Sequence, residues 1–459
     1  MTIAAPDLSM IIKAYDVRGT VPDQLDARIA RALGAAFVRF LASEGPVTQI
    51  VVARDMRESG LELGAAFAEG ATSQGVSVID SGLGSTDLLY YAAGTLAMPG
   101  AMFTASHNPA QYNGIKLCRS GAAPIGQDTG LAAIRDLAQG YLANGLPTFD
   151  GTPGTVTEQD LLGGYAGYVK ALVPGLAGIR PLKVVVDAGN GMGGYTVPTT
   201  FEGLPLTVTE MYFELDGSFP NHEANPIEPA NLRDLQARVL AEGADLGLAF
   251  DGDADRCFVV DERGAIVSPS TLTALIAARE LARVPGSTVI HNLITSRSVP
   301  EVVTEHGGTP VRTRVGHSFI KAEMARSGAV FGGEHSGHFY FREFWNADSG
   351  MLAALHTLAA LGGQAGPLSA LLATYDRYAA SGEINSTVAD QAAKVTELQA
   401  AYAGSAQDEL DGLTVDLGDG AWFNVRASNT EPLLRLNVEA PLEATMVAVR
   451  DAVHAVIRA

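Results

Sequence analysis

The sequence contains few cysteines and few basic residues. Its 459 residues include only two cysteines, Cys118 and Cys257. Two cysteines cannot build a disulfide framework, and buried free thiols in a reducing compartment are the expectation for both. Lysine and arginine number 31 against 51 acidic residues, a formal net charge of −20. Because contacts to a nucleic-acid backbone need clustered cations, this balance argues against nucleic acid as a partner but allows a small anionic substrate held by local arginines.

Long apolar runs are also absent. The first residues lack a basic stretch followed by an apolar segment of signal-peptide length. The most apolar internal segment, 351–361, is too short to span a bilayer and contains His356. We therefore expect a cytoplasmic protein without a membrane partner.

What the chain does contain is typical of a soluble α/β protein. Apolar residues make up 47% of the sequence, which also has 51 glycines, and its length predicts roughly three or four domains. Apolar segments over 50–53, 76–79 and 100–103 predict strands, and the pattern over 61–72 predicts a helix. Strands that alternate with helices indicate a largely parallel sheet whose functional loops gather at the carboxyl ends of the strands.

The segment 103–116, FTASHNPAQYNGIK, combines turn-forming residues with reactive side chains. Its Asn, Pro and Gly residues predict a loop. Within it Ser106 offers a hydroxyl nucleophile, His107 a group expected to titrate near neutrality, and Lys116 a fixed positive charge. An ordinary Ser/Asn/Pro loop is the structural alternative.

Three alternating carboxylates follow an apolar run in LAFDGDADR. Asp251, Asp253 and Asp255 would repel one another unless a hard divalent cation relieves the repulsion, so the spacing predicts a Mg²⁺ site. The same spacing resembles a calcium loop with Glu262 in its twelfth position. However, Arg256 occupies the place where that loop needs glycine, and the flanking segments predict strands rather than helices. A surface acidic turn is the structural alternative.

A glycine-rich segment, 187–194, suggests a different function. It contains GxGxxG at Gly189, Gly191 and Gly194 after a predicted strand, and Glu210 follows about twenty positions later. This pattern is compatible with the dinucleotide fingerprint of an NAD-dependent dehydrogenase, although the motif alone is a weak signal.

Two further loops carry groups suited to a phosphorylated sugar. In GEHSGH at 333–338, Glu334, Ser336 and His338 can form a ring of donors and acceptors for sugar hydroxyls; the alternative, zinc held by His335 and His338, lacks a matched third ligand. In RASNT at 426–430, an arginine and three short polar side chains on a turn provide what a phosphate dianion requires. An ordinary turn between strands is again the alternative. The residues of this second loop are Arg426, Ser428, Asn429 and Thr430.

Taken together, these loops resemble the α-D-phosphohexomutase superfamily, most closely its bacterial phosphomannomutase/phosphoglucomutase branch. The resemblance rests on TASHNP at 104–109, DGDADR at 251–256, GEHSGH at 333–338 and RASNTEP at 426–432, supported by YDVRG at 15–19 and GHS at 316–318. The motifs span nearly the whole chain, and their agreement is far more specific than any one of them.

The resemblance implies an α/β fold of four domains around a central cleft, the first three with similar mixed sheets and the last a smaller α+β domain. The expected ranges are 1–152, 153–256, 257–367 and 368–459. It implies that Ser106 carries a phosphoryl group and binds Mg²⁺ together with the three aspartates. The catalytic residues would be Ser106, His107, Lys116, Arg18 and Arg256. The substrate-binding residues would be Tyr15, Gly316, His317, Glu334, His335, Ser336, His338, Arg426, Ser428, Asn429 and Thr430.

The implied reaction interconverts a hexose 6-phosphate and a hexose 1-phosphate through a hexose 1,6-bisphosphate that also acts as activator. A phosphoglucosamine mutase would usually have SGT where this chain has Ser428-Asn429-Thr430, which favours hexose substrates. Among these, mannose is the expected substrate. A phosphoglucomutase or a dual-specificity enzyme remains the alternative. His335 stands where the dual-specificity enzymes commonly have methionine, and 292–297 lacks a lysine that they often have there.

Overall fold

A computed structural model describes residues 6–12, 15–428 and 433–459, without the side chains of 317 and 318. The chain forms two compact units. The first comprises Met1–Val267 and Gly337–Ser369, and the second comprises Ser268–Ser336 and Ala370–Ala459. Within the described residues, no helix has both the length and the apolar character needed to cross a membrane.

The first unit begins with a mixed six-stranded sheet of order β1-β5-β4-β2-β3-β6. β2 is parallel to β3 and β4, whereas β5 is antiparallel to β4 and β1. The buried segment IVVA in β2 agrees with the strand predicted over 50–53. The strands are β1 (Val17–Thr20), β2 (Gln49–Arg54), β3 (Ser77–Leu83), β4 (Gly100–Phe103), β5 (Tyr112–Cys118) and β6 (Val156–Glu158).

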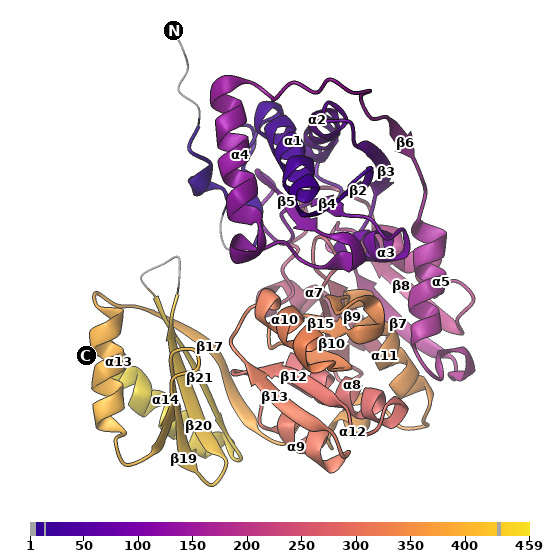
Figure 1. The fold of residues 1–459 in the computed structure, drawn as a ribbon. Helices are drawn as coiled ribbons and strands as arrows, with labels where there is room; N and C mark the ends of the chain where they lie inside the picture. The colour runs from indigo at the N-terminus through magenta and orange to yellow at the C-terminus, as the bar shows by residue number, and fades with distance from the viewer. Residues whose placement is uncertain (1–5, 13–14, 429–432) are drawn as a thin grey trace. The chain divides into compact units, whose positions relative to one another are not determined.

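Four helices accompany this sheet (Figure 1): α1 (Ala27–Glu44), α2 (Ser59–Thr72), α3 (Thr86–Thr95) and α4 (Leu131–Asn144). α1 begins at an Asp26 cap whose side chain accepts from the amide of Ile29 at 2.9 Å. α1 and α2 approach each other through glycines: a Cβ on Gly34 would lie 2.0 Å from the carbonyl oxygen of Phe67, and one on Gly70 would lie 2.0 Å from that of Arg31. The two helices can pack this closely only because Gly34 and Gly70 have no side chain.

The second sheet of the first unit has the order β11-β10-β9-β7-β8. β7 is parallel to β8 and β9, and β10 returns antiparallel to β9. The domain boundary predicted after residue 256 falls between β9 and β10. These two strands are joined by the hairpin 251–256 and pair with each other in one sheet. The elements are β7 (Leu182–Asp187), β8 (Leu206–Met211), β9 (Leu246–Phe250), β10 (Cys257–Asp261), β11 (Ile266–Val267), α5 (Leu162–Leu172), α6 (Gly193–Phe201) and α7 (Arg233–Glu242).

The first unit is completed by a later part of the chain. There β15 (Phe339–Phe341) pairs antiparallel with β16 (Ala347–Asp348), and the buried helix α11 (Gly350–Gly362) follows. Ser349 caps α11 by accepting from the amide of Leu352 at 3.0 Å. Asp348 is thus held between a short strand and a capped helix.

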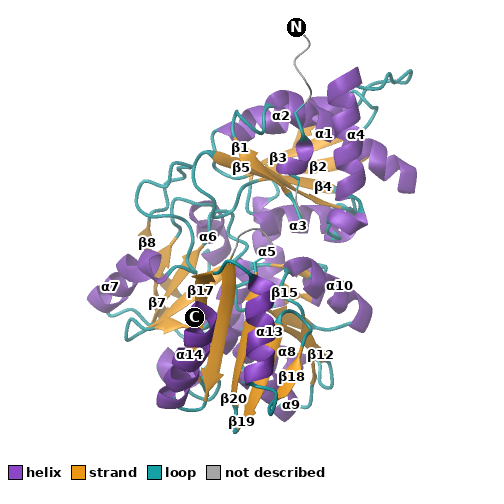
Figure 2. Cartoon of the chain, turned by 90° about the vertical axis from the view of Figure 1, so that its left-hand side faces the viewer, coloured by secondary structure: helices purple, strands orange, loops and turns teal. Residues whose placement is uncertain are grey.

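In the second unit, β12 pairs in parallel with β13 and β14. The last sheet, of order β17-β21-β20-β19-β18, is antiparallel throughout. Figures 1 and 2 show α13 and α14 on one face of this sheet, where they share an apolar core with its strands. The strands are β12 (Thr288–Asn292), β13 (Thr309–Thr313), β14 (Phe331–Gly333), β17 (Ala379–Thr387), β18 (Ala406–Asp408), β19 (Leu413–Gly418), β20 (Ala421–Ala427) and β21 (Leu433–Ala440). The helices are α8 (Pro269–Arg283), α9 (Ser298–Glu305), α10 (His317–Ser327), α13 (Gln391–Ala401) and α14 (Glu443–Arg458). The chain passes from the first unit to the second within the short helix α12 (Leu368–Leu372).

The expected α/β class, with a smaller α+β part at the end of the chain, is confirmed. Cys118 and Cys257 are buried, as predicted, and neither forms a disulfide in the described part of the chain. The central cleft stays a prediction.

The contact between α1 and α2 can be tested by adding one methyl group. We expect Gly34→Ala to lower the free energy of unfolding by about 1–3 kcal/mol, because its Cβ would overlap a backbone carbonyl. Gly140→Ala in α4, where a Cβ would meet nothing within 4 Å, should raise stability by about 0.4–1 kcal/mol. Urea unfolding measures both, and a Gly34→Ala protein as stable as wild type would contradict the described packing.

Candidate active site

Ser106 lies in the loop between the antiparallel strands β4 and β5. The loop is closed by a hydrogen bond from the amide of Thr104 to the carbonyl of Gly114 at 3.1 Å. The Thr104 hydroxyl accepts from the Ser106 amide at 2.8 Å. Ser106 has a φ of 49°, in the left-handed region that residues other than glycine rarely adopt. A constrained turn therefore presents the hydroxyl.

A buried guanidinium holds this loop from the segment between β2 and α2. Arg57 is 2% exposed, and Asp55 accepts from its Nε at 3.3 Å. Its terminal nitrogens donate at 2.6–2.9 Å to four loop carbonyls, those of Ser106, Asn108, Pro109 and Tyr112. Sequence reasoning missed Arg57, because nothing in RDMRES distinguishes an arginine that anchors a loop 49 residues away.

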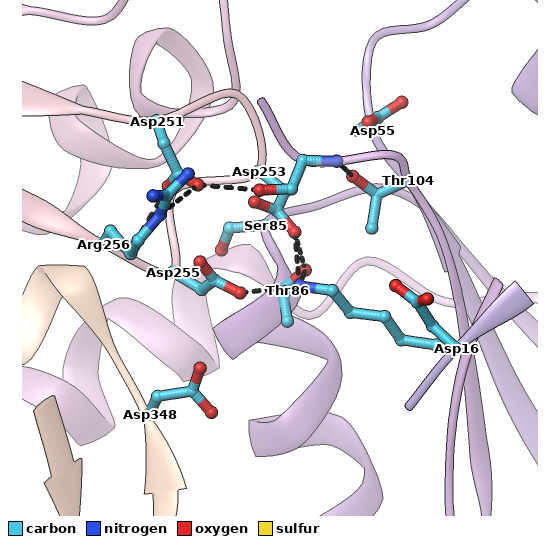
Figure 3. Close-up of polar contacts among 12 residues, drawn as sticks. Asp16, Asp55, Ser85, Thr86, Thr104, Asp251, Asp253, Asp255, Arg256 and Asp348 are labelled. Atoms are coloured by element: carbon cyan, nitrogen blue, oxygen red, sulfur yellow. Dashed lines mark hydrogen bonds and ion pairs between the residues drawn. The ribbon is translucent and has the colours of Figure 1, made fainter. Parts of the chain in front are cut away.

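The three predicted aspartates lie together on the hairpin between β9 and β10 (Figure 3). All three are buried, at no more than 1% exposure. The hairpin approaches the serine loop through Gly252, where a Cβ would lie 2.4 Å from the carbonyl oxygen of Ser106. Glycine at this position is therefore what allows the acidic loop and the serine loop to meet.

The reactive hydroxyl is bonded directly to the acidic loop. Ser106 Oγ donates to Asp251 Oδ2 at 2.9 Å, and Asp251 Oδ2 also accepts from Arg256 Nε at 2.9 Å. Asp251 Oδ1 also accepts from the backbone amide of Arg256 at 3.1 Å. Asp251 thus links the predicted nucleophile to a buried cation.

Lys116 neutralises the other two aspartates. Its ammonium donates to Asp253 Oδ2 at 2.8 Å and to Asp255 Oδ2 at 2.6 Å. Thr86, the first residue of α3, adds a hydroxyl bond to Asp253 at 2.6 Å. Thr86 was not predicted, because its partner lies 167 positions further along the chain.

These contacts change the acidity of the carboxylates in opposite directions. Burial raises the pKa of Asp251, although Arg256 opposes the shift. Burial also acts to raise the pKa of Asp253, but the Lys116 charge and hydrogen bonds from Lys116 and Thr86 outweigh it, and that pKa is lowered. Burial would lower the pKa of Lys116, but Asp253 and Asp255 raise it well above its usual value. Lys116 is therefore a fixed cation, as predicted.

The expectation that His107 titrates near neutrality is wrong. Burial, together with the charges of Arg256 and Arg18, lowers the pKa of His107 to about 2. Its Nδ1 accepts from Arg256 Nη2 at 2.7 Å and lies 3.1 Å from Ser106 Oγ. His107 is consequently a neutral ring that faces the hydroxyl.

The acidic loop fits a hard divalent cation. Its ligands are all carboxylate oxygens within 4.8 Å of one another. Oδ1 of Asp253 and Oδ1 of Asp255 are buried and find no hydrogen-bond partner among the residues the structure describes. Buried carboxylate oxygens of this kind are costly unless a cation binds them, and oxygen donors are what Mg²⁺ prefers.

His338 and Asp348 lie beside the same loop. Nε2 of His338 is 3.7 Å from Asp255 Oδ1 and 3.9 Å from Asp348 Oδ2. His338, Asp255 and Asp348 therefore form a second group of close ligand atoms that shares one aspartate with the first. Asp348 was not predicted, because its sequence context, WNADSG, carries no motif.

Arg18 lies on β1, next to the serine loop. Its Nη1 donates to Asn108 Oδ1 at 2.6 Å, and its Nη2 forms an ion pair with Asp16 at 2.6 Å. Tyr15 is partly exposed just before this strand. The arginine is thus tied to the loop that carries Ser106.

Most of the residues predicted to bind sugar belong to the second unit. Glu334, which is 2% exposed, accepts through Oε1 from the amide of Gly316 at 3.1 Å and from Asn292 Nδ2 at 3.4 Å. The loops at 316–318 and 333–338 are therefore in contact, as expected if residues of both bind the same substrate. His335 and Ser336 follow Glu334 in the same loop, and the side chain of His317 lies outside the described residues.

The predicted phosphate loop follows β20. Arg426 forms an ion pair with Glu383 at 2.7 Å, and the amide of Ser428 donates to the carbonyl of Leu433 at 2.8 Å. The predictions for Asn429 and Thr430 fall outside the described residues.

The glycine-rich segment 187–194 has a packing role in this fold. A Cβ on Gly191 would lie 2.7 Å from the carbonyl oxygen of Gly252, and one on Gly194 would lie 2.3 Å from that of Phe213. The amide of Met192 donates to Gly252 at 2.9 Å. These glycines let the segment support the acidic loop, which explains the motif without a dinucleotide.

Comparison with protein-family models gives four consecutive matches. They are the phosphoglucomutase/phosphomannomutase alpha/beta/alpha domains I, II and III, over residues 9–144, 166–264 and 268–378, and the C-terminal domain of the same proteins, over 383–456. The matches confirm the expectation of four domains.

Curated proteins and solved structures agree with these matches. The chain is 42% identical over 449 residues to "Phosphohexose mutases" of Xanthomonas campestris pv. campestris, with 95% of this chain and 96% of the relative covered. It is 40% identical over 442 residues to a phosphomannomutase of Salmonella montevideo, covering 93% and 94%. A crystal structure of a phosphoglucomutase/phosphomannomutase family protein from Burkholderia thailandensis superposes with a TM-score of 0.86 at 34% identity, covering 98% of this chain and 97% of that one.

The role of Arg57 can be tested without an activity assay. We expect Arg57→Lys to increase amide hydrogen exchange in peptides that cover 104–112, since an ammonium cannot reach all four carbonyls. Arg39→Lys is the control, because Arg39 bonds to Gln74 and Thr148 instead. Exchange in 104–112 that stays at the wild-type level in Arg57→Lys would show that the guanidinium does not hold the loop.

Proposed function

Because the chain belongs to the phosphoglucomutase/phosphomannomutase family, we propose that this phosphohexomutase interconverts mannose 6-phosphate and mannose 1-phosphate through mannose 1,6-bisphosphate. The observation that carries the proposal is the position of Ser106. Its hydroxyl is 2.9 Å from one of three buried aspartates, and these aspartates are paired with the cations Arg256 and Lys116. A serine in this environment can carry a phosphoryl group whose charge is neutralised on several sides.

The proposed reaction consists of two phosphoryl transfers that balance. Phosphorylated Ser106 gives its phosphoryl group to the free hydroxyl of a hexose phosphate: the bond from Ser106 Oγ to phosphorus breaks, and a bond from the sugar oxygen to phosphorus forms. The proton of the sugar hydroxyl ends on Ser106 Oγ. The bisphosphate then turns round, and its other phosphoryl group returns to Ser106 by the reverse exchange.

The surrounding side chains would align and neutralise the transferred group. Lys116 and Arg256 are held by the aspartates next to Ser106 and supply fixed positive charge, while Arg18 adds a third cation beside the serine loop. We assign proton handling to His107 or Lys116. His107 Nδ1 lies 3.1 Å from Ser106 Oγ, and the Lys116 ammonium is held in the same site by Asp253 and Asp255.

Mg²⁺ is the metal that we propose for the acidic loop. Asp251, Asp253 and Asp255 would hold it together with Ser106, and the bound ion would withdraw charge from the phosphoryl oxygens. The Oδ1 atoms of Asp253 and Asp255, which have no hydrogen-bond partner among the described residues, support this assignment.

The second unit would bind the rest of the substrate. We propose that five residues of the second unit contact the sugar: Gly316, His317, Glu334, His335 and Ser336. From the first unit we assign Tyr15 and His338 to the same role. Arg426 and the turn at 428–430 would hold the phosphate that does not react. Because the intermediate must present both of its ends, this set has to accept two orientations of the sugar.

The choice of mannose is tested by measuring kcat/KM for mannose 1-phosphate, glucose 1-phosphate and glucosamine 1-phosphate side by side. We expect mannose 1-phosphate to be used best and glucosamine 1-phosphate least. Equal use of mannose and glucose would establish the dual-specificity alternative instead.

Ser106→Ala should lower turnover by roughly a thousandfold or more, since it removes the hydroxyl on which the proposed phosphoenzyme forms. Intact-mass analysis should find a phosphate on the wild-type protein that the variant lacks. Ser120→Ala, outside the loop, serves as the matched control. Full turnover by Ser106→Ala would refute the proposed mechanism.

Removal of metal should abolish activity, and Mg²⁺ should restore it. Asp253→Asn is expected to raise the Mg²⁺ concentration needed for half-maximal activity, because it removes an ionised ligand. Asp136→Asn, a substitution of an exposed aspartate on α4, should leave that concentration unchanged. Activity that survives exhaustive chelation would exclude the metal assignment.

A further inference from the structure

Gly252, at the tip of the acidic loop, is held through both of its peptide groups. Its amide donates to the carbonyl of Ala224 at 3.2 Å, and its carbonyl accepts from the amide of Met192 at 2.9 Å. Because Gly252 also packs against the backbone of the serine loop, these two bonds help to set the distance between the two loops. The segments that provide them, 187–194 and 220–225, therefore form the two arms of a clamp on the acidic loop.

Side chains join the two arms of the clamp. Nε2 of His222 lies 3.0 Å from Oδ2 of Asp187, the last residue of β7. Nδ2 of Asn221 donates to Oδ1 of Asn190 at 2.8 Å. Asp187 is 1% exposed, and its other oxygen accepts from the amide of Gly189 at 2.9 Å. His222 thus ties the second arm to a buried carboxylate that is itself fixed by the first arm.

Both ring nitrogens of His222 face atoms that accept hydrogen bonds. Nδ1 lies 2.8 Å from the backbone carbonyl oxygen of Glu223, and Nε2 faces the carboxylate of Asp187. A neutral imidazole has only one N–H to donate, so both hydrogen bonds form only when the ring is an imidazolium. The clamp is therefore complete only when His222 is positively charged.

The groups around the ring favour the charged state. Burial acts to lower the pKa of His222, but the hydrogen bond and the charge of Asp187 outweigh it, and the pKa is raised above its ordinary value of 6.5. Asp234 on α7 adds a further negative charge. Tyr212 packs edge-on against the ring with centroids 5.4 Å apart, and its hydroxyl donates to Asp234 at 2.8 Å. Burial and this bond raise the pKa of Tyr212 to about 12, so Tyr212 stays a neutral phenol.

We propose that His222 is a positioning residue: its imidazolium joins the two arms, and the joined arms hold Gly252, and with it the three aspartates of the acidic loop, against the serine loop. Its effect on activity rests on the proposed function, whereas the clamp itself does not depend on the substrate. The contribution of the charged ring is fully present at pH values below 6.5 and is lost as the pH rises through the pKa of His222 in the folded protein. Alkaline pH should therefore loosen the acidic loop.

The charge on the ring is measured first, in the wild-type protein. NMR of isotopically labelled histidine side chains reports the protonation of both ring nitrogens, and the signal of His222 is the one missing from His222→Gln. We expect both nitrogens of His222 to carry a proton and the ring to titrate above 6.5. A ring that titrates at or below this value would overturn the charged clamp.

Amide hydrogen exchange then tests what the ring holds in place. At a pH below 6.5, His222→Gln should increase exchange in peptides that cover 220–225 and 250–256, because the single uncharged amide group of glutamine cannot donate in both directions. His306→Gln is the matched control, since His306 is exposed just after α9 and its Nδ1 faces the carbonyl of Val302. Circular dichroism verifies that each variant is folded. Wild-type exchange over 250–256 in folded His222→Gln would exclude His222 from the support of the acidic loop.

The pH profile of turnover separates positioning from a general loss of structure. At pH values below 6.5 we expect kcat/KM for mannose 1-phosphate to be about tenfold higher in the wild-type protein than in His222→Gln, an effect typical of residues that orient metal ligands. This ratio should fall toward one as the pH rises and the wild-type ring loses its proton. A ratio that stays constant across the titration would contradict the proposal. If neither protein converted mannose 1-phosphate while NMR and exchange gave the expected results, the proposed function would fail and the clamp would stand.

Discussion

The crowding of three buried aspartates on one short hairpin is the constraint around which the first unit is built. Removing a carboxylate from water costs several kcal/mol unless charges or hydrogen bonds compensate. Lys116, Arg256 and Thr86 supply part of this compensation, and they come from three different segments of the chain. Lys116 lies within β5, Thr86 is the first residue of α3, and Arg256 directly precedes β10.

Two loops have to touch for the hydroxyl to reach the aspartates, and backbone geometry allows the contact. The carbonyl of Ser106 lies against Gly252 on one side and accepts from Arg57 on the other. Gly191 in turn packs under Gly252. The position of the nucleophile therefore depends on two glycines and one buried guanidinium that contact the backbone of the two loops.

The limits of sequence reasoning follow from distance along the chain. Asp251, Asp253 and Asp255 could be predicted because their spacing alone makes a cation site, and Ser106 because its loop gathers reactive groups. Arg57 and Thr86 could not, since their roles come from partners 49 and 167 residues away.

The protonation state of residue 107 could not be predicted from the sequence either. The type of residue at position 107 suggested a titrating group, but burial and two arginines hold its pKa near 2. Likewise, the pattern GxGxxG could not reveal that its glycines pack against another loop rather than a ligand. The alternation of strands and helices, by contrast, was sufficient to predict the α/β class, because it depends only on local apolar periodicity.

The left-handed backbone of Ser106 has an evolutionary consequence. Threonine offers the same hydroxyl, but its branched Cβ is poorly tolerated at positive φ. Many sites that use a hydroxyl accept threonine in place of serine. This loop does not, because residue 106 has a positive φ. A substitution at position 106 can keep the hydroxyl nucleophile only if the new residue is unbranched at Cβ.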